Sequence, residues 1–181
     1  EKYRPEKITD VVGQIEGLKA LIVSVKSNSP STIVHGPTGC GKTSAVHALA
    51  KNLGYNILEL NAGDLRDRDS IKEVIGNASK QRSLFSSKKI IFIDEIDNIN
   101  NQDYGGMSAI EHIINSTSFP IVMCANKLYE KKLNNLRKIS NVIEFKRIND
   151  QRILSVLKSI SEKEKIKADE NALKKISLLA G

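Results

Sequence analysis

The chain has 181 residues with a formal net charge of +7; 40% of its residues are hydrophobic and 27% are charged. This composition is typical of a globular protein, and the chain is long enough for one α/β core with a small appendage. It lacks the run of ~18 apolar residues that a membrane span needs. Its first residues are not signal-like, and its two cysteines are too few for a disulfide framework. We therefore expect an intracellular protein without a membrane anchor, and we interpret the sequence as a piece of a longer chain.

The positive charge favours polyanionic partners, although a lysine-rich solvated surface would give the same total. Aromatic residues make up only 4% of the chain and tryptophan is absent, which disfavours a surface that stacks on bases. We expect any DNA contact to be made to phosphates.

Apolar runs of strand length alternate with segments of helical period, which predicts a parallel sheet covered on both faces. The expected strands are 31–35, 55–61, 89–93, 120–124 and 142–145. The expected helices are 42–53, one capped by Asp69, one after Gly105 and Gly106, one capped by Asp150, and one from about Asp169. The change to pure helix predicts a domain boundary near Ile148.

A glycine-rich segment between the first strand and its helix satisfies the pattern G-x-x-x-x-G-K-[ST]. It consists of Gly36, Pro37, Thr38, Gly39, Cys40, Gly41, Lys42 and Thr43. Backbone N–H groups of such a loop, together with the helix N-terminus, bind phosphate oxygens. We expect Lys42 to reach the β- and γ-phosphates and Thr43 to offer its hydroxyl to Mg²⁺.

The third strand ends in Asp94 and Glu95, an arrangement known as Walker B. We expect Asp94 to hold hydrated Mg²⁺ beside the loop and Glu95 to polarise the attacking water. We expect the nearby Asp97 to be solvated or to cap a helix. Asn126 follows the fourth strand, where it can bond the γ-phosphate or the water, although Asn at a strand end is also a common turn residue.

The sequence resembles the AAA+ ATPases and, within them, the clamp loaders of archaea and eukaryotes, above all their large subunits. The resemblance covers nearly the whole chain. It rests on the phosphate loop and on segments 1–5, 11–14, 59–62, 94–97, 103–106, 125–126 and 143–147. It implies a P-loop core with a five-stranded parallel sheet at 1–148, followed at 149–181 by the beginning of a helical lid domain.

The resemblance also implies roles for particular residues. Tyr3, Arg4, Val11 and Val12 would line the adenine pocket, and Asn126 would be the family's first sensor. Asn61 would match a polar residue that restrains the catalytic glutamate until DNA binds. ATP or ADP and Mg²⁺ are the implied cofactors.

Two departures from the family pattern are visible. Small clamp-loader subunits carry a Ser-Arg-Cys triplet whose arginine completes a neighbour's ATP site, whereas this chain has Lys138-Ile139-Ser140 there. This difference favours a large subunit, although a shifted alignment would give Arg137 that role. The sequence also ends before the second-sensor arginine of the family.

The resemblance implies a hetero-oligomeric ring with small subunits, a sliding clamp and primer–template DNA as partners, in the cytoplasm of an archaeon or the nucleus of a eukaryote. Lys72, Lys80 and Arg82 are the candidate contacts to DNA phosphates. A basic cluster could meet a neighbouring subunit or the clamp; it consists of Lys127, Lys131, Lys132, Arg137 and Lys138.

We predict an ATPase subunit that loads the clamp. One alternative is a nucleotide-gated scaffold with little hydrolysis of its own. The other is an AAA+ protein of the branch-migration or origin-recognition type.

Overall fold

The computed structural model describes residues 2–27, 29–61, 88–99 and 106–180. Its centre is a five-stranded parallel sheet with the strand order β2-β3-β4-β1-β5. The strands are β1 (Ser31–His35), β2 (Asn56–Asn61), β3 (Lys89–Asp94), β4 (Ile121–Ala125) and β5 (Asn141–Glu144). The predicted parallel α/β sheet is confirmed, and each strand lies within one residue of its expected bounds.

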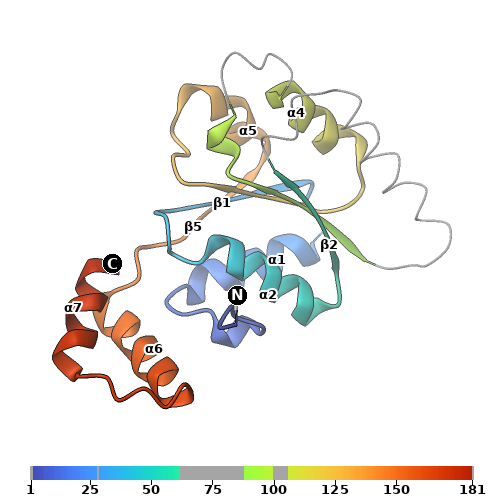
Figure 1. Cartoon of the computed structure of the whole chain (residues 1–181). Helices are drawn as coiled ribbons and strands as arrows, with labels where there is room; N and C mark the ends of the chain where they lie inside the picture. The colour runs from blue at the N-terminus through green and yellow to red at the C-terminus, as the bar shows by residue number, and fades with distance from the viewer. Residues whose placement is uncertain (1, 28, 62–87, 100–105, 181) are drawn as a thin grey trace.

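Helices cover both faces of this sheet (Figure 1). On one face lie α1 (Ile15–Lys26) and α2 (Lys42–Leu53), and on the other lie α4 (Gly106–Ser116) and α5 (Asn134–Ile139). Each face has its own cluster of buried apolar side chains. The middle strands contribute to both clusters because alternate residues of a strand point to opposite faces.

Local sequence explains where several elements begin and end. The strand interiors of β3 and β4 are buried and rich in β-branched residues, which suit a sheet covered on both sides. Gly54 ends α2 in the left-handed conformation at φ 69°, as its position in the sequence predicts. Three short 3₁₀ turns, η1 (Ile8–Asp10), η4 (Ile96–Asn98) and η5 (Lys131–Leu133), complete the described core.

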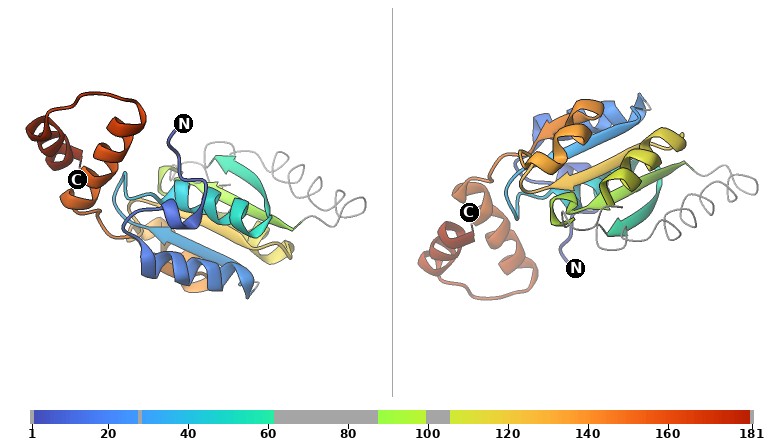
Figure 2. Two further views of the ribbon diagram at one scale, coloured as in Figure 1. Left: turned by 90° about the horizontal axis from the view of Figure 1, so that it is seen from below. Right: turned by 90° about the horizontal axis from the view of Figure 1, so that it is seen from above.

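The last two helices, α6 (Asp150–Lys163) and α7 (Glu170–Ala180), pack against each other to one side of the sheet (Figure 2). The prediction that Asp150 caps α6 is wrong, because the side chain of Asn149 accepts the Arg152 N–H there. Asp150 is the first helical residue instead. Within the described ranges, no helix is long and apolar enough to cross a membrane.

The order of the strands determines where a ligand site can form. The chain runs from β1 to the far edge at β2, returns through β3 and β4, and then crosses β1 to reach β5. Such a reversal beside the central strand leaves a crevice at the carboxyl ends of the strands. Gly36, Glu95 and Asn126 directly follow β1, β3 and β4 and therefore come to the same edge.

Candidate nucleotide site

The phosphate loop connects β1 to α2 and is pressed against the end of β5. A Cβ atom on Gly36 would lie only 2.1 Å from the carbonyl oxygen of Phe145, so a side chain is excluded at this position. At the other end of the loop, Gly41 caps α2 with φ 94°, a conformation that favours glycine. The loop thus directs the N-terminus of a 12-residue helix toward the carboxyl edge of the sheet.

Lys42 is the first residue of α2 and is only 8% exposed. Its ammonium group donates to the carbonyl oxygens of Gly36 at 2.8 Å and Pro37 at 2.9 Å. It also donates to the side-chain oxygen of Asn126 at 2.8 Å. The charge is therefore held inside the loop and is linked to the residue that follows β4.

Thr43 and Asp94 lie side by side, although they are far apart in the sequence. The Thr43 hydroxyl donates to an Asp94 carboxylate oxygen at 2.8 Å. Hydroxyl and carboxylate oxygens are ligands that Mg²⁺ accepts, with water and phosphate completing its shell. Among the described residues, no group of three or more His, Cys, Asp or Glu side chains gathers as a metal site. Thr43 and Asp94 are therefore the candidate ligands for a Mg²⁺ ion.

Glu95 directly follows β3 and is exposed. Its backbone is left-handed, with φ 52° and ψ 46°. One carboxylate oxygen accepts the side-chain amide of Asn98 at 2.8 Å, and its backbone N–H donates to Asp94 at 2.9 Å. Glu95 is thus held at the edge of the site beside Asp94 and stays accessible to solvent.

Asp97 was expected to be solvated or to cap a helix, and the first expectation is wrong. The residue is only 8% exposed. Its two carboxylate oxygens accept the backbone N–H groups of Asn126 and Lys127, each at 3.1 Å. Asp97 therefore fixes the backbone of the residue that bonds Lys42.

These residues surround a cavity of about 270 Å³ at the edge of the sheet. It is lined by Thr38, Gly39, Gly41, Lys42, Thr43, Ser44, Asp94, Glu95, Cys124, Ala125 and Asn126. A second cavity of about 310 Å³ lies on the other side of the loop. It is lined by Pro37, Thr38, Gly39 and Cys40 from the loop, by Arg147 and Ile148, and by Ile153 and Ala180 of the last two helices.

The opening segment divides between two environments. Val11 is buried against α1 and α2, and its side chain would be 3.9 Å from a Cβ on Gly41, so it lies beside the loop. Val12 is half-buried next to it. Arg4 instead lines a separate cavity of about 480 Å³ with residues of α2 and β2.

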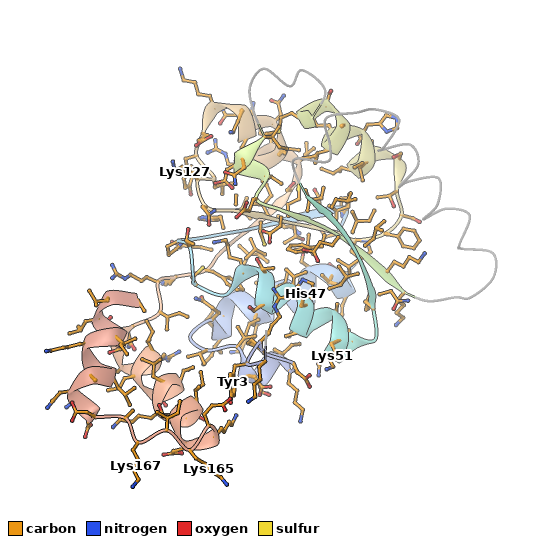
Figure 3. All side chains as sticks on the ribbon, viewed as in Figure 1. Tyr3, His47, Lys51, Lys127, Lys165 and Lys167 are labelled. Carbon is orange, nitrogen blue, oxygen red and sulfur yellow. The ribbon has the colours of Figure 1, made fainter. Side chains whose placement is uncertain are left out.

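Tyr3 lies between the core helices and the turn after α6 (Figure 3). Its hydroxyl donates to the Glu164 carboxylate, which also receives the Lys2 ammonium. The structure thus places Tyr3 and Arg4 away from the residues that line the two cavities at the loop.

Gln14 is a further residue of the site, and it belongs to the segment 11–14 that contributes to the family resemblance. It is 4% exposed, and its amide donates to the carbonyl oxygens of Cys40 at 3.1 Å and Lys146 at 2.6 Å. Its own oxygen accepts the N–H of Lys146 at 3.1 Å. Gln14 thereby ties the phosphate loop to the segment that follows β5. No local pattern reveals this role, because the partners are 26 and 132 residues away.

The remaining predicted residues are only partly described. Lys72, Lys80, Arg82 and the helix capped by Asp69 lie outside the described residues, as does the side chain of Asn61. The backbone of Asn61 is in register with Asp94.

The basic cluster is not a uniform surface. The Lys132 ammonium bonds the backbone oxygens of Asp97 and Ile99 and pairs with Glu130. Arg137 lies over the ring of the exposed Tyr129, 5.0 Å from its centroid. Two of the five cations therefore have intramolecular partners.

Burial raises the pKa of both cysteines. The shift is larger for Cys124, near the end of β4, than for Cys40 in the loop, and the charge of Lys42 opposes it at both thiols. Both thiols are free and buried, so they stay protonated at neutral pH and act as small apolar side chains.

Comparison with known proteins identifies relatives that align with nearly the whole of this chain. The chain is 40% identical over 183 residues to the Replication factor C large subunit of Staphylothermus marinus, with 97% of this chain and 43% of the relative covered. Proteins of the same name from Nanoarchaeum equitans and Thermofilum pendens are each 39% identical. These alignments cover 99% and 98% of this chain and 43% and 45% of the relatives. The chain thus spans less than half the length of these curated relatives.

The match to a protein family covers the sheet, the phosphate loop and the carboxylates that follow β3. Residues 32–147 match the family described as "ATPase family associated with various cellular activities (AAA)". Membership of this family implies nucleotide binding, in agreement with the geometry of the loop. The chain belongs to the AAA family of ATPases.

Proposed function

We propose that this chain is the nucleotide-binding core of a clamp-loader large subunit, which binds and hydrolyses ATP to open a sliding clamp and load it on primer–template DNA. The observation that carries the proposal is the convergence of the loop, the two carboxylates after β3 and Asn126 on one cavity. The similarity of the chain to proteins named Replication factor C large subunit supports the assignment to clamp loading.

Binding begins with the triphosphate in the loop. The backbone N–H groups of the loop and the N-terminus of α2 attract the phosphate oxygens. Lys42 exchanges its carbonyl acceptors for the β- and γ-phosphates. The nucleoside extends toward the cavity beside Cys40 and Ile148, with Val11 and Val12 near the base. Tyr3 and Arg4 would join this base pocket only if the opening segment moved from its described position.

Thr43 and Asp94 are the residues that would hold Mg²⁺. The ion supplies positive charge that stabilises the phosphates during transfer. The 2.8 Å bond between the two side chains supports this role, because it brings their oxygens together beside the loop.

Hydrolysis follows from the positions of Glu95 and Asn126. Glu95 polarises a water molecule, whose oxygen forms a bond to the γ-phosphorus while the bond to the β,γ-bridging oxygen breaks. The products are ADP and inorganic phosphate, and the proton passes through Glu95 to solvent. Asn126 donates its amide to the γ-phosphate, and Lys42 stabilises the negative charge.

The same proposal extends to the assembly. The chain joins small subunits in a hetero-oligomeric ring inside the cell, with α6 and α7 as the beginning of a helical lid. Lys72, Lys80 and Arg82 contact the DNA backbone, and Asn61 restrains Glu95 until DNA binds. Arg137 is engaged with Tyr129 and Asn134, which disfavours it as an arginine that completes a neighbour's site.

The Glu95→Gln variant tests this proposal. The full-length chain is assembled with its partner subunits, whose own nucleotide sites are disabled. We expect ATP affinity to stay within about twofold and turnover to fall by roughly 10² to 10⁴, because the amide cannot take the proton. Clamp loading should fall with turnover.

Two further variants complete the experiment. Lys42→Ala should abolish magnesium-dependent ATP binding, whereas Lys19→Ala, a change on the exposed face of α1, should bind as the parent does. Unchanged turnover in Glu95→Gln, or unchanged binding in Lys42→Ala, would refute the ATPase assignment. Normal clamp loading without turnover would refute hydrolysis as the driving step.

A further inference from the structure

The turn η4 connects the end of β3 to the rest of the site through two neighbouring polar residues. Ile96 is fully buried and anchors the turn in the core. Asp97 points inward to the end of β4, whereas Asn98 is exposed and bonds Glu95. One three-residue turn therefore contacts both Glu95 and Asn126.

Asn98 holds Glu95 at two points. Its backbone N–H donates to the Glu95 carbonyl oxygen at 2.8 Å, which closes the turn. Its side-chain amide donates to one Glu95 carboxylate oxygen at 2.8 Å. The second contact removes rotational freedom from an exposed glutamate that would otherwise sample several rotamers.

Asp97 holds Asn126 in a different way. Because it accepts the consecutive N–H groups of Asn126 and Lys127, it fixes the backbone at the end of β4. Hydrogen bonds to an ionised carboxylate are stronger than those between neutral groups. The Asn126 side chain in turn bonds Lys42 at 2.8 Å, so a continuous series of contacts runs from Asp97 to the loop.

We propose that η4 is the positioning element of the hydrolytic site, with Asn98 orienting Glu95 and Asp97 orienting Asn126. The proposal rests on ATP hydrolysis at this site. Asp97 and Asn98 are positioning residues, since they act through Glu95 and Asn126. Their loss lowers the rate of the chemical step and leaves nucleotide affinity in place.

The test measures ATP turnover and ATP affinity of the assembled complex with the partner sites disabled. Asn98→Ala should lower kcat about ten- to a hundredfold, the loss expected for a hydrogen bond to a charged group, with KM and ADP affinity within about twofold. Asn52→Ala, which removes another exposed asparagine, from α2, should leave kcat unchanged.

Double mutants separate positioning from a general structural effect. In a Glu95→Gln background, Asn98→Ala should change the residual turnover by less than about twofold, because the group through which it acts is gone. Asp97→Asn, which preserves shape but lacks one acceptor, should likewise lower kcat alone and add little to Asn126→Ala. Thermal unfolding of each variant checks that the core is intact.

The outcomes distinguish the two levels of the argument. If the parent complex shows no turnover from this site, or if Glu95→Gln keeps its turnover, the ATPase assignment fails and the positioning role fails with it. If Glu95→Gln loses turnover while Asn98→Ala keeps it, or if the effects of the paired variants multiply, only the role of η4 is overturned. Should Asp97→Asn fail to fold, the Asn98 variants alone decide the matter.

Discussion

Glu95 has a backbone conformation that glutamate rarely adopts. At φ 52° and ψ 46° its Cβ crowds the following carbonyl, at a cost of roughly 1–2 kcal/mol relative to a residue that tolerates this region. Gly and Asn are such residues. A glutamate at this position therefore lowers stability, and such local conflicts concentrate at functional sites.

The first prediction follows from this conflict. The free energy of unfolding of Glu95→Asn should be about 0.5–1 kcal/mol higher than that of Glu95→Gln, because asparagine tolerates the left-handed region better than glutamine does. Both variants lack the carboxylate that we propose to activate water, and both should lose turnover alike. Urea denaturation of the two proteins makes the comparison. Equal midpoints and slopes would contradict a strained Glu95.

The phosphate loop could be predicted because its residues are consecutive in the sequence and form one continuous motif. Asp94, Glu95 and Asn126 could be predicted because strand ends are visible as the end of an apolar run. The burial of Asp97 could not be predicted, since it depends on two N–H groups 29 and 30 residues away. A sequence shows that a carboxylate is present but not which distant backbone will cover it.

At the scale of elements, Gln14 joins three segments that are remote in sequence. It directly precedes α1. Its side-chain N–H donates to the carbonyl oxygen of Cys40 in the loop, and its N–H and oxygen both bond the backbone of Lys146, two residues after β5. Three backbone groups therefore depend on one buried side chain. Loss of that side chain leaves them without a partner, which costs more than the bonds themselves contribute.

Gln14→Met, which keeps the length of the side chain, should lower the free energy of unfolding by about 1–3 kcal/mol. It should also weaken ADP binding, because the carbonyl of Cys40 in the loop loses its restraint. Chemical denaturation and nucleotide titration measure the two effects. Gln151→Met, on the exposed face of α6, is the matched control and should change neither. Normal stability in Gln14→Met would contradict a bridging role.

The five strands and the helices α2, α4, α6 and α7 could be predicted, whereas α1, α5 and the arrangement of the elements could not. The runs at 31–35 and 89–93 are apolar enough to identify buried strands. The strand order β2-β3-β4-β1-β5 depends on pairings between segments up to about 110 residues apart, such as Thr32 with Asn141. The cap of α6 was assigned one residue late because Asn149 and Asp150 are both good capping residues, and only the backbone decides between them.

At the scale of the whole molecule, α6 and α7 approach the core both beside the phosphate loop and at the opening segment. Beside the loop, the segment after β5 lines the second cavity. At the opening segment, Glu164 receives the Lys2 ammonium and the Tyr3 hydroxyl. A nucleotide bound beside the loop would therefore lie where the two parts of the molecule meet.

The contact at Glu164 predicts a dependence on pH. The Lys2 ammonium, followed by the Tyr3 hydroxyl, lowers the pKa of the Glu164 carboxyl. A lowered carboxyl pKa means that the contact contributes above the ordinary carboxyl pKa and is lost as pH falls through the lowered value. Residues 2–10 should then exchange their amide hydrogens faster below about pH 4, after correction for the intrinsic rate.

Two variants verify the assignment. In Glu164→Gln, residues 2–10 should exchange their amide hydrogens rapidly at every pH, without the increase in rate at low pH. Glu170→Gln removes a carboxyl whose pKa is also lowered, by Lys158, but whose contact lies within the α6–α7 pair. This variant should keep the increase in amide exchange at low pH. If the increase persists in Glu164→Gln, another group causes the pH dependence.

The bonds of Lys42 have a consequence for anion selectivity. Its ammonium already has three oxygen acceptors within 2.9 Å, so an arriving oxyanion must displace some of them. Exchanging one hydrogen bond for another yields little, about 1 kcal/mol or less. Orthophosphate and sulfate gain little from this exchange and depend on the loop N–H groups and the N-terminus of α2 for their binding. A longer anion can contact these N–H groups with several phosphates and also reach Thr43 and Asp94, so we expect the loop to bind it more tightly than a simple anion.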